Sequence, residues 1–300
     1  MSQKLSFNST VYQGSRLTQI AMPLGGIGSG CICLNGQGGL QDFSIRNRPA
    51  TTALPDGHGT TDAAFALLHV KGETPVTKLL EGSLPPAKLY DQGLQSQGYR
   101  KGGHDGLPRF ESCEFQAEYP FGEVRLRDPH IPLAVSIAGW NPFIPGDDVP
   151  SSLPAAILEY TFQNTSGVPV EFEFSYHLSS LACGALGWSR TCNAVLPEGG
   201  VLFTNTENGS HETYGSGALL PLTHTPRLKA DWFRGGWFDG ISMLWREVST
   251  GTFRENVQPA PAGNPNRNGG SFLVPLSLGP GEEVCVPLVL AWHFPNSNNR

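Results

Sequence analysis

The residue types that carry hydrolytic chemistry are present, but they do not form a recognisable catalytic pattern. The sequence contains no Gly-x-Ser-x-Gly nucleophile motif and no His-Glu-x-x-His zinc motif. Its eight histidines and six cysteines lack the spacing of metal ligands. Any two of the 26 acidic residues would suit glycoside chemistry, but such a pair is defined by a distance that the sequence does not contain. We therefore predict no triad, no metal site and no bound cofactor from these patterns.

A glycine-rich segment is the most distinctive part of the chain. It runs from Pro23 to Gly30 in the order Pro-Leu-Gly-Gly-Ile-Gly-Ser-Gly. Gly26, Gly28 and Gly30 are two residues apart, whereas a dinucleotide loop needs Gly-x-Gly-x-x-Gly between a strand and a helix. We interpret the segment as a strand or wide turn in which missing side chains let another backbone or a ligand approach closely.

Two aromatic segments combine flat apolar rings with hydrogen-bonding groups, as sugar-binding sites do. The first begins at Trp140 and ends at Asp148, and the second runs from Trp232 to Gly240 with Trp237 between them. Burial of such rings to anchor a loop is the commoner arrangement. Sugar binding and loop anchoring are therefore both open interpretations.

The elements that must position these residues are predicted to be strands. Gly and Pro account for 37 and 25 of the 300 residues, while only 15% of residues are charged. Abundant turn formers with scarce charge argue against long helices and for many short strands. The length suits one large all-β domain or two ordinary ones, but no repeat and no convincing linker divides it. We predict a single all-β domain over residues 1–300 with few, short helices.

Strict alternation of apolar and polar residues marks the clearest strands. Residues 156–162 and 170–178 alternate on either side of a turn-forming Gln-Asn-Thr-Ser-Gly segment, which predicts a hairpin. Residues 131–137 and 284–292 also alternate, and Pro287 predicts a bulge or an edge within the latter. Shorter strands are predicted at 31–34, 64–70, 113–119, 122–127, 201–204 and 241–247.

Charge and hydropathy exclude several kinds of partner and location. The net charge is −6 and no basic stretch is present, so we expect no nucleic-acid partner. No apolar run approaches the roughly 18 residues of a membrane helix, and the first residues lack the apolar core of a secretory signal. We therefore expect no transmembrane segment and a cytoplasmic location. Cys31 and Cys33 are expected to be reduced and to face the same side of a strand.

Taken together, the motifs resemble the N-terminal region of family-116 glycoside hydrolases, which include bile-acid β-glucosidase, also called non-lysosomal glucosylceramidase. The resemblance begins with Pro23 to Gly30 and continues through Gly39 to Pro49. Further matches follow in the family's order and extend the resemblance over most of 20–295. They are Tyr119-Pro120, Pro142 to Pro145, Ser151 to Pro154 with the following strands and Asn164, Trp237 to Gly240, and Ala291 to Pro295.

The resemblance implies a large antiparallel β-sandwich, similar to the supersandwich domains that precede (α/α)₆ barrels. In that family the retaining pair, a glutamate nucleophile and an aspartate acid/base, belongs to the helical barrel. The sequence ends at Arg300 before any such barrel, so no catalytic residue is transferred and we expect this chain alone to be inactive. Its expected partner is the C-terminal catalytic barrel of the same polypeptide, through which the complete enzyme would act on a β-glucoside.

Several residues are candidates for the surface that would face the barrel or form the rim of its sugar pocket. They are Gly26, Gly28, Asp42, Arg46, Asn47, Arg48, Trp140 and Trp237. Glycine permits close approach, and an arginine can bind a carboxylate through two hydrogen bonds. Three alternatives are open: pairing of Asp42 with Arg46 inside the domain, a stand-alone carbohydrate-binding or interaction module, and a purely structural role.

Overall fold

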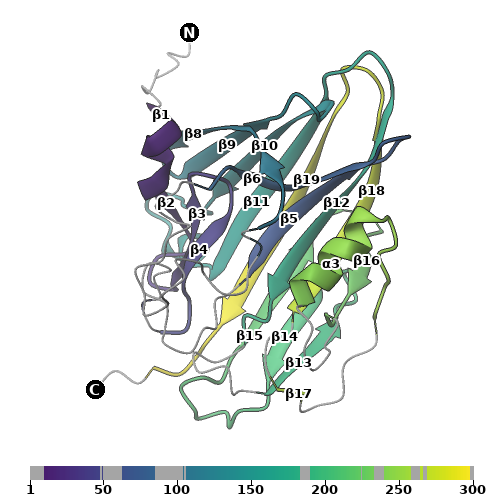
Figure 1. The fold of residues 1–300 in the computed structure, drawn as a ribbon. Helices are drawn as coiled ribbons and strands as arrows, with labels where there is room; N and C mark the ends of the chain where they lie inside the picture. The colour runs from purple at the N-terminus through teal and green to yellow at the C-terminus, as the bar shows by residue number, and fades with distance from the viewer. Residues whose placement is uncertain are drawn as a thin grey trace, which may run out of the picture.

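The fold is a β-sandwich, as Figure 1 shows. The computed structural model describes residues 10–47, 49, 63–84, 104, 106–182, 190–223, 225–232, 240–257, 264–265 and 269–297. Strands dominate these residues and the three described helices are short, so the predicted all-β fold with few short helices is confirmed. No helix among the described residues is long and apolar enough to cross a membrane.

A ten-stranded antiparallel sheet forms one layer. Across the sheet its strands are β1 (Thr10–Gln13), β8 (Ser112–Glu118), β9 (Phe121–Arg127), β10 (Leu133–Trp140), β11 (Ala155–Asn164), β19 (Glu283–His293), β15 (Ser216–Pro221), β14 (Val201–Asn205), β13 (Arg190–Val195) and β17 (Asn264–Pro265).

A six-stranded sheet forms the second layer and a three-stranded sheet lies beside the two. The six strands are, in order, β16 (Arg227–Lys229), β18 (Gly269–Leu278), β12 (Val170–Ser179), β5 (Ala64–Val70), β6 (Val76–Gly82) and β7 (Arg109–Phe110). The small sheet and the helices are β2 (Ala21–Leu24), β3 (Cys31–Asn35), β4 (Leu40–Ser44), η1 (Gly14–Gln19), α2 (Asp148–Ser151) and α3 (Gly240–Ser249).

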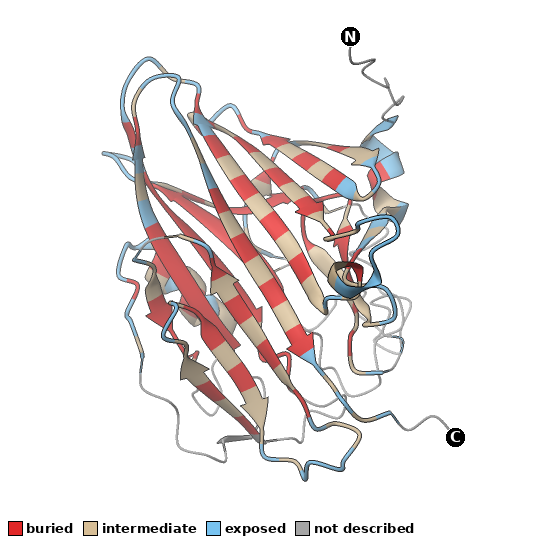
Figure 2. Ribbon diagram, turned by 180° about the vertical axis from the view of Figure 1, so that it is seen from behind, coloured by how far each residue is buried: buried red, intermediate tan, exposed pale blue. Residues whose placement is uncertain are grey.

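The alternating sequences place every second side chain in the space between the sheets. Buried and half-buried residues alternate along β10 and β11, and Figure 2 shows this as red and tan bands. Aromatic rings fill the centre: the ring of Phe174 lies 4.9 Å from that of Tyr160 and 5.3 Å from that of Phe162. Strands from both layers therefore share one core.

Helix α3 covers the outer face of the six-stranded sheet, as Figure 1 shows. Leu244 and Val248 pack there with Phe65 and Leu67, which explains why every residue of β5 is buried. The strand predicted at 241–247 is therefore wrong. Its apolar residues also recur three and four positions apart, which is the period of a helix. A helix with this period can bury its apolar side against the outer face of the sheet.

The hairpin predicted for residues 155–178 is also wrong, although both of its strands exist. Strand β11 pairs with β10 and β19 in one sheet, whereas β12 pairs with β18 and β5 in the other. Residues 165–169 therefore form an arch between the two sheets instead of a hairpin turn. Strands β18 and β19 are joined by a second arch of the same kind.

Pro287 lies in β19, between two paired strands, and the pairing with β11 continues through it without a change of register. The predicted bulge is therefore absent there. The amide of Leu222 donates a hydrogen bond to the Pro287 carbonyl. The nitrogen and the carbonyl of one residue point to the same side of an antiparallel strand. The Pro287 nitrogen therefore faces the position just after Pro221, where β15 ends and no ladder partner is needed. The proline thus occupies a local edge.

Asn164 joins the two arches. Its side-chain Nδ2 donates to the carbonyls of Val168, Leu278 and Gly279 at 2.8, 3.0 and 3.1 Å. Its Oδ1 accepts hydrogen bonds from the amide and the hydroxyl of Ser166. The side chain is buried, with 1% exposure of the residue, so one amide replaces the sheet partners that both arches lack.

We predict that Asn164→Ala lowers the free energy of unfolding by about 3 kcal/mol or more, because the variant loses the hydrogen bonds from Nδ2 to three carbonyls and those from Ser166 to Oδ1. Asn208 is a matched control, since its Oδ1 accepts the same two bonds from Ser210 in an exposed turn. Asn208→Ala should cost about 1 kcal/mol or less. Urea unfolding of both variants measures the difference, and equal costs would contradict the role of Asn164.

Candidate functional site

A cleft of about 530 Å³ lies where the glycine-rich turn, the end of β4 and the end of β19 meet. Segments far apart in the sequence form its walls. The described residues that line it are Gly28, Ser29, Gly30, Ser44, Ile45, Asn47, Pro49, Ser152, Pro154, Trp292, His293 and Phe294. Gly28 and Asn47, both predicted as site residues, are therefore brought together in one cleft.

The glycine-rich segment forms the turn between β2 and β3, which confirms the wide turn expected from its sequence. A Cβ at Gly26 would lie 2.4 Å from the backbone carbon of Ser152 and 2.5 Å from the carbonyl oxygen of Leu153. Gly28 has a φ of +73° and open space around it. Gly26 is therefore required by close packing of two backbones, whereas Gly28 is required by its left-handed conformation.

Asn141 and Trp292 hold this turn against the large sheet. Asn141 accepts a hydrogen bond from the Gly25 amide and donates one of 3.0 Å to the Pro23 carbonyl. The indole Nε1 of Trp292 donates to the Ser29 carbonyl at 2.7 Å, and Trp292 is buried. Both anchors were absent from the predicted site. Trp292 belongs to the segment that matches the family pattern, so resemblance was the signal that pointed to it.

Arg46 and Asn47 hold the segment that follows β19. The Nδ2 of Asn47 donates to the carbonyls of Phe294 and Asn296 at 2.9 and 2.7 Å. The Nε of Arg46 donates to the Leu181 carbonyl at 3.0 Å, and its guanidinium lies 5.9 Å from the centre of the Phe294 ring. These two predicted residues therefore bind the chain where it leaves the sandwich.

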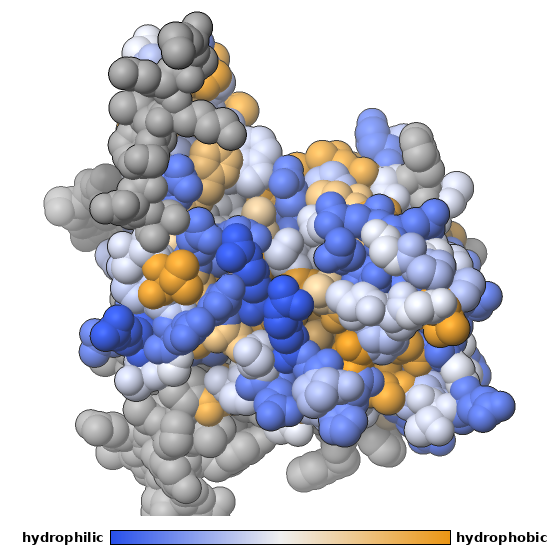
Figure 3. Space-filling view, turned by 90° about the horizontal axis from the view of Figure 1, so that it is seen from above, coloured by the Kyte–Doolittle hydropathy of each residue, from blue (hydrophilic) through white to orange (hydrophobic). Residues whose placement is uncertain are grey.

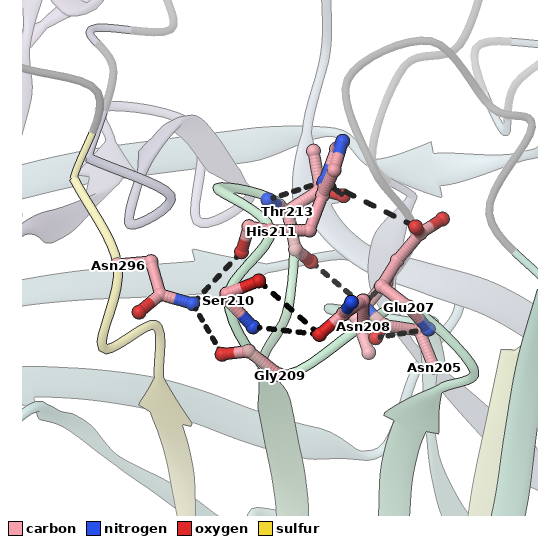
Figure 4. Close-up of polar contacts among 9 residues, drawn as sticks. Asn205, Glu207, Asn208, Gly209, Ser210, His211, Thr213 and Asn296 are labelled. Carbon is pink, nitrogen blue, oxygen red and sulfur yellow. Dashed lines mark hydrogen bonds and ion pairs between the residues drawn. The ribbon is translucent and has the colours of Figure 1, made fainter.

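A loop between β14 and β15 holds the same segment from the other side, as Figure 4 shows. The Nδ2 of Asn296 donates to the carbonyls of Gly209 and His211 at 2.7 and 2.9 Å. The loop is itself closed by Asn205, whose Nδ2 donates to the Thr213 carbonyl. Asn296 and Asn205 were missed from the sequence because asparagines in turns are common and their distant partners are not visible there.

Asp42 lies in a bulge of β4, beside the cleft but not among the residues that line it. It has a left-handed backbone with a φ of 57°, and its carboxylate accepts a hydrogen bond of 2.9 Å from Gln41. Its charge faces Cys31 and Cys33 on the neighbouring strand β3. Both cysteines lie on one face of that strand, as expected.

Trp140 lies at the end of β10 with its ring 6.3 Å from that of Phe121, and it is not among the residues that line the cleft. Tyr119 and Phe143 form a second ring pair at 5.8 Å. We call these four residues the aromatic patch; two of them, Tyr119 and Phe121, are more than half exposed. Arg48 and Trp237 lie outside the described residues.

The cleft offers hydroxyl, amide and backbone groups, but none of its described lining residues is Asp or Glu. Within the described part of the chain, no group of three or more His, Cys, Asp and Glu could hold a metal ion. His177 lies elsewhere, fully buried between the hydroxyls of Ser175 and Ser271, and desolvation lowers its pKa to about 3. His177 is therefore a neutral, structural histidine.

Comparison with known proteins gave one family match and distant similarities to solved structures, of which two are described below. The family described as beta-glucosidase 2, glycosyl-hydrolase family 116 N-term, matches residues 21–300. No curated protein matches the sequence.

Among solved structures, a putative kojibiose phosphorylase from the human microbiome aligns with 94% of this chain and 25% of its own, at a TM-score of 0.39 and 8% identity. A polysaccharide lyase aligns with 96% of this chain and 33% of its own, at a TM-score of 0.37 and 13% identity. The chain thus spans a quarter to a third of the length of these two proteins.

The two kinds of glycine in the turn predict different costs of substitution. Gly26→Ala should lower the free energy of unfolding by about 3 kcal/mol, since its Cβ would overlap the backbone at Ser152 and Leu153. Gly28→Ala should cost about 1–2 kcal/mol, the strain of a left-handed residue without steric overlap. Thermal and urea unfolding measure both. A cost for Gly26→Ala no larger than that for Gly28→Ala would show that the backbones do not pack as described.

Proposed function

Because the chain belongs to the N-terminal domain family of glycosyl-hydrolase family 116, we propose that it is the non-catalytic β-sandwich domain of a retaining β-glucosidase resembling glucosylceramidase. In this proposal residues 1–300 form one domain, and the end of the sandwich that carries the cleft packs against the catalytic barrel of the same polypeptide. That contact helps to shape the barrel's sugar pocket.

One observation carries the proposal: the cleft gathers the separate segments that resemble the family. The turn at 23–30, the segment at 39–49 and the segment at 291–295 are far apart in the sequence but meet around this cleft. Trp292 and Asn47 connect them through hydrogen bonds to Ser29 and Phe294. A surface built from these three segments is the natural candidate for a role that the family shares.

The cleft also has the features of a docking surface. Ile27 and Leu153, next to Gly28 and Ser152, are 60% and 49% exposed, so two aliphatic side chains beside the cleft are available to pack against a second domain. The segment after β19 is fixed at the same place by Asn47 and the β14–β15 loop. A polypeptide that continues from this segment would therefore start at the cleft.

The proposed division of labour follows from the chemistry of retaining glycosidases. They require two carboxylates about 5 Å apart, one as nucleophile and one as acid/base. The described residues that line the cleft supply neither, so both carboxylates are assigned to the barrel, which would also bind the β-glucoside. We further propose a cytoplasmic location, which the five described cysteines support because all are free thiols.

The direct test is an assay of the 300-residue chain with an aryl β-glucoside. We expect no turnover above a buffer blank, because the retaining pair lies in another domain. A chain denatured by heat provides the matched control for spontaneous hydrolysis. Turnover that one Asp or Glu substitution within residues 1–300 abolishes would refute the proposal.

The aromatic patch supports a second candidate function, direct carbohydrate binding by this domain. Tyr119 and Phe121 are 63% and 51% exposed, and their rings lie near those of Phe143 and Trp140, so flat apolar faces are available to stack on sugar rings. This patch is separate from the residues that line the cleft. A stand-alone binding module would use it without the barrel.

Tryptophan fluorescence distinguishes this candidate from the first. If the patch binds sugar, titration with cello-oligosaccharides should give a saturable change that Trp140→Ala abolishes. Trp232→Phe is the control, because Trp232 is buried outside the patch and its loss should leave the titration intact. The absence of any saturable change in the unmodified chain would rule out sugar binding at the patch.

A further inference from the structure

The loop between β14 and β15 contains an asparagine that is followed by glycine. The sequence has three such pairs, Asn35-Gly36, Asn208-Gly209 and Asn268-Gly269, of which Asn268 lies outside the described residues. A glycine has no side chain to keep its backbone nitrogen away from the amide carbon of the asparagine before it. Such a pair can therefore react with itself, and the surroundings of the pair decide how readily it does so.

The pair at Asn208 is open to solvent. Asn208, Gly209 and Ser210 are all exposed, so water reaches this turn. The Gly209 amide and the Asn208 Nδ2 donate to no group in the described part of the chain. A Cβ at Gly209 would meet nothing within 4 Å. The nitrogen that would attack the Asn208 amide and the nitrogen that would leave it are therefore both unhindered.

The pair at Asn35 lies between β3 and β4 in very different surroundings. Gly36 is buried, and a Cβ there would lie 2.4 Å from the carbonyl oxygen of Leu17. The Oδ1 of Asn35 accepts hydrogen bonds from the amides of Gln37 and Gly39 at 2.9 and 3.0 Å. The backbone of this pair is packed against another segment and shielded from water. The structure thus provides an internal reference for the exposed pair at Asn208.

We propose that Asn208 is a site of deamidation, a modification that converts its side-chain amide to the carboxylate of aspartate or isoaspartate. The Gly209 nitrogen loses its proton to hydroxide, and its electron pair forms a bond to the Asn208 Cγ. Nδ2 then takes a proton from water and leaves as ammonia, so that a cyclic imide remains. Water opens the imide at either of its carbonyls. The net reaction consumes one water and releases one ammonia, and no oxidant or reductant takes part.

Ser210 promotes the attack. Its amide and its hydroxyl donate to the Oδ1 of Asn208 at 3.1 and 3.2 Å, as Figure 4 shows. Negative charge develops on this oxygen as the Gly209 nitrogen bonds to Cγ. Hydrogen-bond donors that already point at such an oxygen stabilise the transition state. The hydroxyl is the donor that substitution can remove without changing the Asn-Gly pair itself.

The modification would loosen the hold of this loop on Asn296. The carbonyls of Gly209 and His211 accept hydrogen bonds from the Asn296 Nδ2, and the His211 amide donates to the backbone carbonyl of Asn208 at 2.7 Å. In isoaspartate the backbone runs through the former side chain, so the Asn208 carbonyl becomes part of a side-chain carboxylate. Gly209 is then displaced along the chain by one carbon, and the two carbonyls no longer converge on Asn296.

The segment that contains Asn296 is the one from which a catalytic domain would continue. Release of this segment would therefore free the start of the connection between the two domains. That last step rests on the proposed function, whereas the reaction at Asn208 and the release of Asn296 do not.

Incubation of the 300-residue chain at pH 8 tests the proposal, with peptide mass spectrometry for deamidation and an isoaspartyl methyltransferase assay for isoaspartate. We expect Asn208 to deamidate at least about 10-fold faster than Asn35 in the folded chain, because only local unfolding exposes the buried pair. In urea, which exposes both pairs, the two rates should agree within about threefold. The fold, and not the dipeptide, would then account for the difference.

Two variants test the chemistry. Gly209→Ala should slow deamidation of Asn208 at least about 10-fold, because its methyl group hinders the attacking nitrogen. The open space at Gly209 lets this variant keep the fold. Ser210→Ala should slow the reaction about 5-fold, the factor that corresponds to one ordinary hydrogen bond.

Hydrogen exchange tests the release of Asn296. After incubation, the peptide that contains residues 294–297 should exchange at least about threefold faster in molecules with isoaspartate at position 208, whereas Gly209→Ala incubated in the same way should not change. Equal rates at Asn208 and Asn35 in the folded chain would overturn the site. An unchanged rate in Gly209→Ala or Ser210→Ala would overturn the role given to that residue, and unchanged exchange would overturn the release. None of these measurements involves glycosidase activity or the barrel, so they are independent of the proposed function.

Discussion

Asn164 satisfies the main constraint on this sandwich, which is that the chain must pass from one sheet to the other at neighbouring arches without leaving backbone groups unpaired. In a hairpin the two strands pair with each other, so their backbone groups form hydrogen bonds within one sheet. In an arch the chain leaves the sheet, so its backbone groups need other hydrogen-bond partners. The Asn164 side chain replaces those partners in both arches, with Nδ2 reaching Val168 in one and Leu278 and Gly279 in the other. Strands β11 and β18 thereby end, and strands β12 and β19 begin, at a common fixed point, and all four lie inside the two sheets.

The cleft lies at the opposite ends of two of these strands. Strand β11 begins next to Pro154 and β19 ends at His293, and both residues line the cleft, whereas Asn164 and Glu283 lie at the arches. Strand β11 has ten residues, so its end at the arch and its end at the cleft lie about 30 Å apart. Figure 3 views the molecule from above, the side of the arches in Figure 1, and hydrophilic residues cover most of that end, with smaller hydrophobic patches between them. The arches hold the strands at one end of the sandwich. The segments that resemble the family lie around the cleft at the other end.

Much of the fold followed from the sequence because period-two alternation reports which residues face a core. That pattern says nothing about the partner of a strand, so the Asn-Thr-Ser-Gly segment after Gln163 was taken for a hairpin turn when it forms an arch. At 241–247 a short apolar segment fitted both periods, and packing on the outer face of the sheet selected the helix. Gly28 and Asn47 were found through the resemblance. Asn296 was not, because its partners at Gly209 and His211 are about 85 residues away in the sequence.

Binding between separate polypeptides most directly tests the proposal that the cleft end docks the catalytic domain. The reading frame that follows Arg300 would be expressed alone and titrated with this chain by calorimetry. We predict saturable binding that Ile27→Asp weakens at least about 10-fold, whereas Val168→Asp, at an equally exposed valine on the arch, leaves it unchanged. Equal affinity for both variants, or a frame that encodes no helical domain, would contradict the account.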